Sequence, residues 1–484
     1  MSKIKDIWNF LMSHQLYRVV NIVIYIFYFV QSDYGIDYIP YVVSFFWGIL
    51  IIIYDFFTKR VMFKQPYWIL LLLLCVSYVI SIATNFPTNL VHNGMNLVYL
   101  AISVFIFYST DPDLSEDRKL KDIKIMNDVF IGIIFILGIV SITMFIFNVS
   151  YHLDGNIRQG FMESRLFGVF TSPNIMSMFG YVSCFMILIN NYIKRGSWKK
   201  IQKFYVINVL TQYICYLLSS SRGTQLALVG FAIFLFLTIC IRVLFVEKNK
   251  FKKIGKSLLL IVGICVSLSY LGQFIENGLS YIPSIVSSIT TKTEEQVVVD
   301  ETGKETVIKV KEPIEKVVIQ HSEEHAEVSS GRLSIWRAGL KLVQQKPLFG
   351  VGDSYVYRSG NLSPQIKEYN LSEIDKSELR RAHGNMHNTY IAVLVKGGIV
   401  SFVILSLFII FILKDNFFYI INKKIDFDSE KIQVYAITLA FLLSLFVNDL
   451  VENHLIFNNR DVMGLVFWSY LGYLNHFRIK HTNN

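Results

Sequence analysis

Long runs of apolar residues, separated by short polar stretches, extend through most of this chain. About twelve of these runs approach the roughly 20 residues that a helix needs to cross a membrane. They are nearly continuous in Leu, Ile, Phe and Val, without the alternation of apolar and polar residues that marks the strands of a membrane barrel. The pattern predicts an all-α polytopic membrane protein with about twelve transmembrane helices. We place these at residues 17–32, 39–57, 67–84, 93–109, 127–148, 173–192, 204–220, 224–245, 257–275, 389–413, 433–450 and 461–477.

Basic residues between the apolar runs predict the orientation of the helices. Most Lys and Arg residues lie in one alternate set of loops, which is the pattern of cytoplasmic loops. The short loops of the opposite set carry only Arg158, Arg165, Arg222 and Arg460. We therefore expect both termini in the cytoplasm of a multi-pass protein of the cell membrane.

This orientation divides the chain into three parts. Residues 1–275 form an N-terminal membrane domain with about nine helices, and residues 389–484 a C-terminal one with about three. Between them, residues 276–388 form one large extracellular loop. Its alternating residues at 296–312, with a glycine in the middle, predict a β-hairpin to which we assign no chemistry.

An amphipathic helix is predicted at residues 330–346 of the extracellular loop. Ser329 or Ser330 can cap it. Its apolar residues at helical spacing, which would form one face, are Leu333, Trp336, Leu340 and Val343. We expect this helix to lie across the outer membrane surface.

The composition excludes two other classes of protein. The chain is 53% hydrophobic and only 17% charged, whereas soluble domains are nearer a quarter charged. A net charge of +10 suggests a nucleic-acid partner, but the basic residues are spread over short loops, so we expect none. The five cysteines lie in apolar runs without pairing or metal-ligand spacing, and no phosphate-binding glycine loop or external Asp-x-Asp pair is present. The sequence therefore predicts chemistry without a metal, nucleotide or other cofactor.

Arg222 is the first candidate for chemistry. It lies in a very short external break, from Ser219 to Thr224, between two apolar runs. An unpaired cation near the bilayer rim costs a few kcal/mol, so an arginine there needs a reason. The alternative is a loop residue whose side chain extends to the aqueous interface.

Arg332 and His387 are the other two candidates for chemistry. Arg332 shares a helix face with Trp336, and two converging arginines would bind both phosphates of a pyrophosphate; the alternative is a surface arginine stacked on Trp336. His387 immediately precedes an apolar helix that Asn388 or Thr389 can cap, where it can exchange a proton near neutral pH. A structural role, in capping or in binding a lipid headgroup, is the alternative, and His383 is a competing candidate.

Other polar residues complete the set of candidates. We count five as candidate substrate-binding residues: Arg158, Arg165, Trp336, Asn388 and Tyr390. Three in the last outer loop, Asp449, Glu452 and His454, include carboxylates that could orient a histidine or a sugar. Lys396, inside an apolar helix, could reach the interface, pair with an acid or face a cavity.

In their order, these motifs resemble the O-antigen ligase and Wzy-type polysaccharide polymerase superfamily. The similar pieces are Ser221-Arg222-Gly223 between two helices, Gly331-Arg332 followed by Trp336, then Pro347, Gly350 and Gly352, and His387-Asn388 opening a helix. In the ligases the His-Asn pair is followed by nine residues and Gly-x-x-Gly; here the first glycine is Gly398 and the last position is Ser401.

The resemblance implies glycosyl transfer between lipid-linked molecules on the outer face of the membrane. It implies a glycan donor on undecaprenyl pyrophosphate, Arg222 and Arg332 against the pyrophosphate, and His387 as catalytic base. Partners would be the lipid-linked donor and acceptor, membrane lipids, and candidates for a chain-length regulator and a flippase.

Three functions remain open from the sequence. A composition rich in Lys, Ile, Asn, Phe and Tyr is typical of AT-rich genomes and favours a polymerase of capsular or exopolysaccharide repeat units over a ligase that uses another acceptor. A lipid-linked oligosaccharide flippase would be expected to show internal repeats and charges across the bilayer, and we find mainly charges at its rim. A scaffold protein would leave the outer Arg and His residues without a role.

Overall fold

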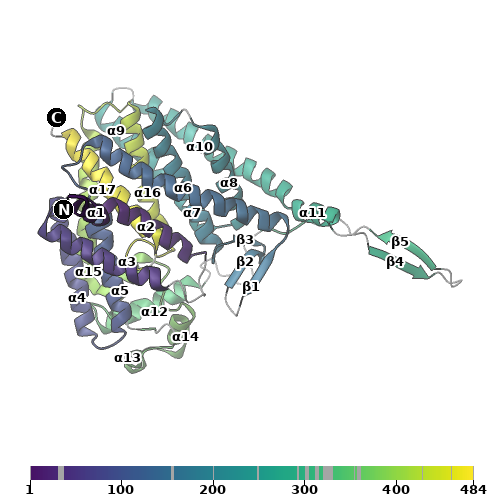
Figure 1. Ribbon diagram of the computed structural model, residues 1–484, viewed down its shortest axis with the longest axis horizontal. Coiled ribbons are helices and arrows are strands. Elements are labelled where there is room, and N and C mark those ends of the chain that lie inside the picture. The colour runs from purple at the N-terminus through teal and green to yellow at the C-terminus, as the bar shows by residue number, and fades with distance from the viewer. Residues whose placement is uncertain are drawn as a thin grey trace.

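The structure is a computed structural model, and it describes most of the chain. The described residues are 2–30, 38–153, 157–199, 201–247, 250–290, 294–299, 305–310, 316–319, 331–353, 355–356, 361–427, 429–458 and 461–482. Long helices form a bundle, and the two termini lie at one edge of it (Figure 1). From the opposite edge a β-hairpin projects.

Every apolar run predicted to cross the membrane overlaps a helix. In chain order the helices before the hairpin are α1 (Ser2–Leu11), α2 (His14–Tyr28), α3 (Tyr38–Phe57), α4 (Trp68–Thr84), α5 (Leu90–Ile102) continuing as a π-helical turn (Ser103–Phe107), α6 (Glu116–Ile146), α7 (Pro173–Arg195), α8 (Lys203–Ser219), α9 (Arg222–Val246), α10 (Lys250–Leu279) and α11 (Ile282–Thr290). The later ones are α12 (Arg332–Gln345), α13 (Pro364–Glu368), α14 (Glu373–Arg381), α15 (Thr389–Ile421), α16 (Glu430–Asn448) and α17 (Val462–Thr482).

Within the described residues, eight helices are long and apolar enough to cross a membrane, or nine if α1 and α2, bent by 48°, form one span. The chain is therefore a mostly helical, multi-pass membrane protein. The remaining predicted spans fall on α4, which is shorter, and on α8 and α17. The total of twelve and the orientation stay predictions.

The first half of the predicted loop, residues 276–388, projects away from the bundle. Strands β4 (Glu294–Val299) and β5 (Glu305–Val310) pair antiparallel, where the alternation predicts a hairpin. Their turn lies outside the described residues. The hairpin extends beyond α11 as the most distant part of the molecule (Figure 1).

The second half packs onto the bundle through a hydrophobic cluster of its own. In α12 the buried residues are Ile335, Ala338, Gly339 and Leu342, which face α14 and α15. Leu333 and Leu340, which belong to the predicted apolar face, are 60% and 46% exposed. The face that packs on the protein is therefore a different one, and the location of this helix on the membrane surface stays a prediction. The buried stripe is offset because the small residues Ala338 and Gly339 permit close packing on α15. Ser329 and Ser330, the predicted caps, lie outside the described residues, as does Arg460, and the N-cap position is Gly331.

A short segment, residues 347–352, fills a break in α15. The break is at Gly398, whose backbone is left-handed (φ 70°). Two N–H groups of the segment donate to carbonyls of α15 before the break, and two N–H groups of α15 after it donate to carbonyls of the segment, all between 2.8 and 3.1 Å. The pairs are Val351–Val395, Gly352–Lys396, Ile399–Pro347 and Val400–Leu348. The segment thus satisfies backbone groups that the interrupted helix cannot pair internally.

The sequence analysis predicted no sheet in the bundle, but the structure contains one. Strands β1 (Ser150–Leu153), β2 (Ile157–Met162) and β3 (Arg165–Gly168) form a small antiparallel sheet in the loop between α6 and α7. Its strands are too short and too irregular in polarity to stand out among long apolar runs. β3 packs against α6, α7 and α8, which fixes Arg165 beside the start of α7.

Candidate active site

The main cavity of the structure has a volume of about 760 Å³, within the usual range for ligand sites. It is lined where several helices begin: Ser172 and Asn174 at α7, Ser221 and Gly223 at α9, Arg332 at α12, and His387 just before α15. Because the N-terminus of a helix carries unpaired N–H groups and a partial positive charge, this convergence favours an anionic ligand. Side chains cap three of these helices; the caps are Ser172, Ser221 and Asn388.

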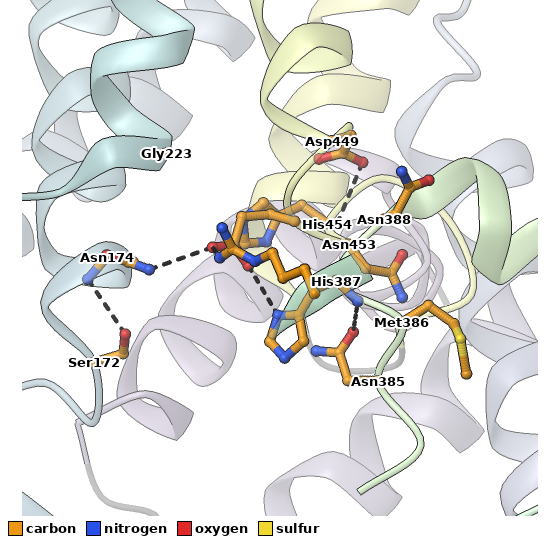
Figure 2. Close-up of polar contacts among 12 residues, drawn as sticks. Ser172, Asn174, Gly223, Asn385, Met386, His387, Asn388, Asp449, Asn453 and His454 are labelled. Carbon is orange, nitrogen blue, oxygen red and sulfur yellow. Dashed lines mark hydrogen bonds and ion pairs between the residues drawn. The ribbon is translucent and has the colours of Figure 1, made fainter. Parts of the chain in front are cut away.

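Glu452, in the loop between α16 and α17, connects the two main candidates. Its Oε1 accepts hydrogen bonds from Arg332 Nη2 (2.8 Å) and from Asn174 Nδ2 (3.3 Å), and its Oε2 lies 3.4 Å from His387 Nδ1. Figure 2 shows Asn174 and His387 reaching toward the same point from opposite sides. The Glu452 side chain is 13% exposed.

The charge of Glu452 is fixed by these neighbours. Burial favours the neutral acid, but the hydrogen bond from His387 and the positive charges of His387, Arg332 and His454 together lower the pKa of Glu452 to about 2. The group is therefore a carboxylate at neutral pH. One of its oxygens is placed to accept a hydrogen bond from a protonated imidazole nitrogen, and the other accepts one from a guanidinium.

His387 is held in place on both sides by backbone contacts. Its backbone is left-handed (φ 45°), and its N–H donates to Asn385 Oδ1 at 2.9 Å. The indole of Trp336 donates to the carbonyl of Met386 at 2.9 Å. Asn388 accepts from the N–H of Ile391 as N-cap of α15. A residue other than glycine or asparagine in this conformation costs about 1 kcal/mol or more, so the surrounding contacts hold the imidazole toward Glu452.

Histidine His383 also lines the cavity, with a left-handed backbone (φ 47°). Of the two histidines, His387 is the one that contacts a carboxylate in the described part of the chain. This difference favours His387 as the base.

The predicted arginines lie at different depths. Arg332 lines the cavity and is 20% exposed. Arg165 donates to Ser219 O (2.8 Å) and to Asn174 Oδ1 (2.7 Å). Asn174 therefore connects Arg165 to Glu452. Arg222 begins α9 and is exposed beside Arg165, close enough for their positive charges to interact, but it does not line the cavity. The structure therefore brings Arg332 and His387 together and leaves Arg222 at the rim.

The other predicted binding residues are not among the described residues that line the cavity. Arg158 is exposed on β2 and pairs with Glu163. Tyr390 donates to Phe446 O at 2.8 Å, and Asn388 donates to Leu450 O at 2.9 Å. With Trp336, these two side chains fix the start of α15 rather than face the ligand space.

A second histidine–carboxylate pair lies beside Glu452. His454 Nδ1 is 2.5 Å from Asp461 Oδ2, and the backbone N–H of His454 donates to Asp449 Oδ2. Burial lowers the pKa of His454, but the charge of Asp461 and its hydrogen bond, with Asp449 and Glu452, raise it to about 10. Burial raises the pKa of Asp449 to about 7. His454 is therefore a fixed positive charge in the cavity wall at neutral pH.

The sequence analysis named Glu452 only as a lesser candidate, and it did not name Asp461. The signal available was the density of polar residues between the last two apolar runs: Asp449, Glu452, Asn453, His454, Asn458 and Asp461. In the described residues, no three His, Cys, Asp or Glu side chains are grouped so as to hold a metal ion. The expectation of a reaction without a metal stays a prediction.

Comparison with known proteins finds a family match for part of the chain. Residues 207–406 match the model of the family described as O-Antigen ligase. No curated protein sequence matches the chain. The family match confirms the relationship predicted from the motifs between Ser221 and Ser401. It includes Arg222, Arg332 and His387 and ends before Glu452.

Proposed function

We propose that this chain, a member of the O-antigen ligase family through residues 207–406, is a polysaccharide polymerase. It transfers a glycan from undecaprenyl pyrophosphate to a sugar of another lipid-linked repeat unit on the outer face of the cell membrane. One observation carries the proposal: a buried carboxylate, Glu452, holds an arginine and a histidine at the wall of one cavity. A base beside an anion-binding group is what this transfer requires.

The pyrophosphate would lie where the helix N-termini meet. Arg332 enters the cavity, Arg165 and Arg222 supply positive charge at its rim, and the N–H groups at the starts of α7 and α9 surround the same space. Negative charge grows on the pyrophosphate as it leaves, so donors fixed in advance stabilise the transition state more than the bound substrate. Guanidinium groups suit this because they bind phosphate oxygens in pairs.

His387 would act as the base. It takes the proton from a hydroxyl of the acceptor sugar while that oxygen forms a bond to the anomeric carbon of the donor. The bond from that carbon to the pyrophosphate oxygen breaks, and the electron pair leaves with the pyrophosphate. Glu452 stabilises the imidazolium that results, as the buried carboxylate of a catalytic triad does. The proton then passes to the leaving pyrophosphate or to water.

The contact between Glu452 and Arg332 has a consequence for donor binding. Without substrate, the carboxylate occupies the position that a phosphate oxygen would take on Arg332. Donor pyrophosphate would compete with Glu452 for the guanidinium, which leaves the carboxylate to His387 alone.

The remaining wall of the cavity fits a lipid-linked substrate. Apolar side chains from α2, its C-terminus and α7 line it next to Asn174; these are Tyr28, Phe29, Ile175 and Met178. They could take the first part of the polyprenyl chain. The outer location follows from the basic loops on the opposite side, and the same site would serve a ligase with a different acceptor.

The test uses purified protein in nanodiscs with a lipid-pyrophosphate-linked repeat unit, a chelator and no nucleotide. Wild-type protein should give a ladder of polymer on a gel. Arg332→Ala should slow its formation by about 10²- to 10³-fold, the usual effect of losing one electrostatic donor. A wild-type protein that moves the lipid-linked unit across a vesicle membrane but never extends it would overturn the polymerase in favour of a flippase.

Glu452→Gln separates the two roles of the carboxylate in the same assay. The maximal rate should fall, because the imidazolium is no longer stabilised. Affinity for polyprenyl pyrophosphate without sugar should rise, because Arg332 is released. An equal loss of rate and affinity would show that Glu452 is needed only for folding of the site, and Arg380→Gln, on the exposed surface of α14, is the matched control.

A further inference from the structure

A second polar cluster lines the same cavity and has no part in the proposed mechanism. It is centred on Asp353, which follows the segment that fills the break in α15. Asp353 Oδ2 accepts from Asn96 Nδ2 (2.6 Å) and lies 3.0 Å from Lys396 Nζ and 3.1 Å from His92 Nε2. Lys396 also donates to Phe457 O at 2.8 Å. All four members of the cluster line the cavity.

The depth of this cluster argues against a purely structural role. The side chains of Asp353 and Lys396 are only 8% and 7% exposed, and Lys396 lies within a membrane helix. A buried ion pair is often no more stabilising than apolar side chains of the same size. Ionisable residues at membrane depth usually face a water-filled path and mark the route of a substrate.

The arrangement leaves one carboxylate oxygen for a ligand. The three side-chain donors converge on Oδ2, whereas Oδ1 accepts no hydrogen bond from any residue that the structure describes. The backbone of Asp353 is fixed as well, since its N–H donates to Asn93 Oδ1 and its carbonyl accepts from Asn89. His92 is 42% exposed on the same wall. A fixed carboxylate beside an amide and an imidazole is suited to hydroxyl groups, which donate as well as accept.

The charge of this wall differs from that of the anion-binding wall. The positive charge of Lys396 is matched by Asp353, and an additional phosphate would meet the carboxylate. On the other side the three arginines Arg332, Arg165 and Arg222 outnumber their acidic neighbours, Glu452 and Glu163. Lys396 lies seven residues after Thr389, the first residue of α15, which is about 10 Å along the helix axis from the end next to His387. That distance leaves room for sugar residues between the two clusters.

From these observations we propose that Asp353, with His92 and Asn96, forms a saccharide subsite that binds hydroxyl groups of the repeat unit. This inference rests on the proposed function, because it assigns the sugar-binding part of the same cavity. The glycan can belong to the donor or to the acceptor, and the chemistry of recognition is the same. Asp353 and His92 are then residues that select the sugar and position it, without contact with the reacting atoms.

The test separates the sugar from the pyrophosphate. The probes are polyprenyl pyrophosphate without sugar, the intact lipid-linked repeat unit, and the glycan released from it by mild acid and tagged at its reducing end. Asp353→Asn keeps the shape of the side chain, and His92→Asn changes a half-exposed residue, so at least one variant should fold. Arg380→Gln is again the control.

Both variants should weaken binding of the tagged glycan by about 10- to 100-fold, the range expected when a charged hydrogen bond is lost, and leave binding of polyprenyl pyrophosphate unchanged. In the transfer assay, a KM raised for the tagged glycan alone identifies the acceptor, and a KM raised for the lipid-linked unit alone identifies the donor glycan. Unchanged glycan binding and unchanged KM values in a folded His92→Asn variant would overturn the subsite. If wild-type protein binds the glycan but never transfers it, the polymerase fails and the subsite stands.

Discussion

The two halves of the large segment between α11 and α15 behave in opposite ways. The first half forms the hairpin β4–β5, whose strands pair with each other and project from the bundle (Figure 1). The second half, from Gly331 onward, has its own hydrophobic cluster and is hydrogen-bonded into α15. It supplies Arg332, Asp353 and His387 to the cavity. Polar sequence outside the membrane helices thus becomes part of a site only where it is packed against them.

The largest expected effect falls on a residue of the packed half. His387→Ala removes the proposed base and should lower the rate of transfer by about 10²- to 10⁴-fold with little change in donor affinity. Rates from single-turnover reactions in nanodiscs would measure this. His383→Ala is the control on the same wall of the cavity; if it were the more damaging change, the base would be His383.

The packing itself can be broken at Gly398. Its backbone is left-handed, and a Cβ there would overlap the carbonyl of Leu348 in the inserted segment. Gly398→Ala should therefore destabilise the protein by about 3 kcal/mol, through strain and displacement of that segment. Thermal unfolding in nanodiscs would measure the loss. Gly278→Ala in α10, where a Cβ meets nothing within 4 Å, should be neutral or slightly stabilising.

The loop between α16 and α17, which contains His454, should make the stability of the protein depend on pH in the alkaline range. The pKa of His454 is about 10 in the folded protein, above its ordinary 6.5. Its protonation therefore stabilises the fold fully below about pH 6.5, and this contribution is lost as the pH rises through 10, at up to about 1.4 kcal/mol per pH unit. The melting temperature of wild-type protein should fall more steeply between pH 8 and 10.5 than that of His454→Asn. Parallel curves would show that Asp461 does not hold the proton on His454.

The smallest effect is expected from the projecting half. Replacing residues 294–310 by a short Gly/Ser linker should change the transfer rate less than twofold and leave the melting temperature nearly unchanged, because none of the described residues that line the cavity comes from the hairpin. Gel ladders and thermal unfolding would measure both. A loss comparable to that of His387→Ala would mean that the hairpin contacts the glycan or a partner during transfer.

Local sequence predicted the parts of this protein that depend on local pattern. The apolar runs predicted the long helices, and the motifs around Arg222, Arg332 and His387 predicted which residues would lie near a site. The face of α12 that packs on α14 and α15 was not predicted, because its position depends on what the helix packs against, and Ala338 and Gly339 allow an approach that larger residues would prevent. The pairing of Glu452 with His387 and of Asp353 with His92 could not be identified, since each carboxylate meets its histidine only after segments far apart in the chain have packed together.

The insertion at the break in α15 also limits how this protein can be recombined. Four backbone hydrogen bonds join residues 347–352 to the helix, and they cross the boundary at residue 388 that the sequence suggests between loop and membrane domain. A chimera that exchanged only the loop with a relative would separate carbonyl and amide groups that are paired with each other. The smallest transplantable unit therefore runs from Gly331 through Val400, so the second half of the loop and the start of α15 are expected to be inherited together.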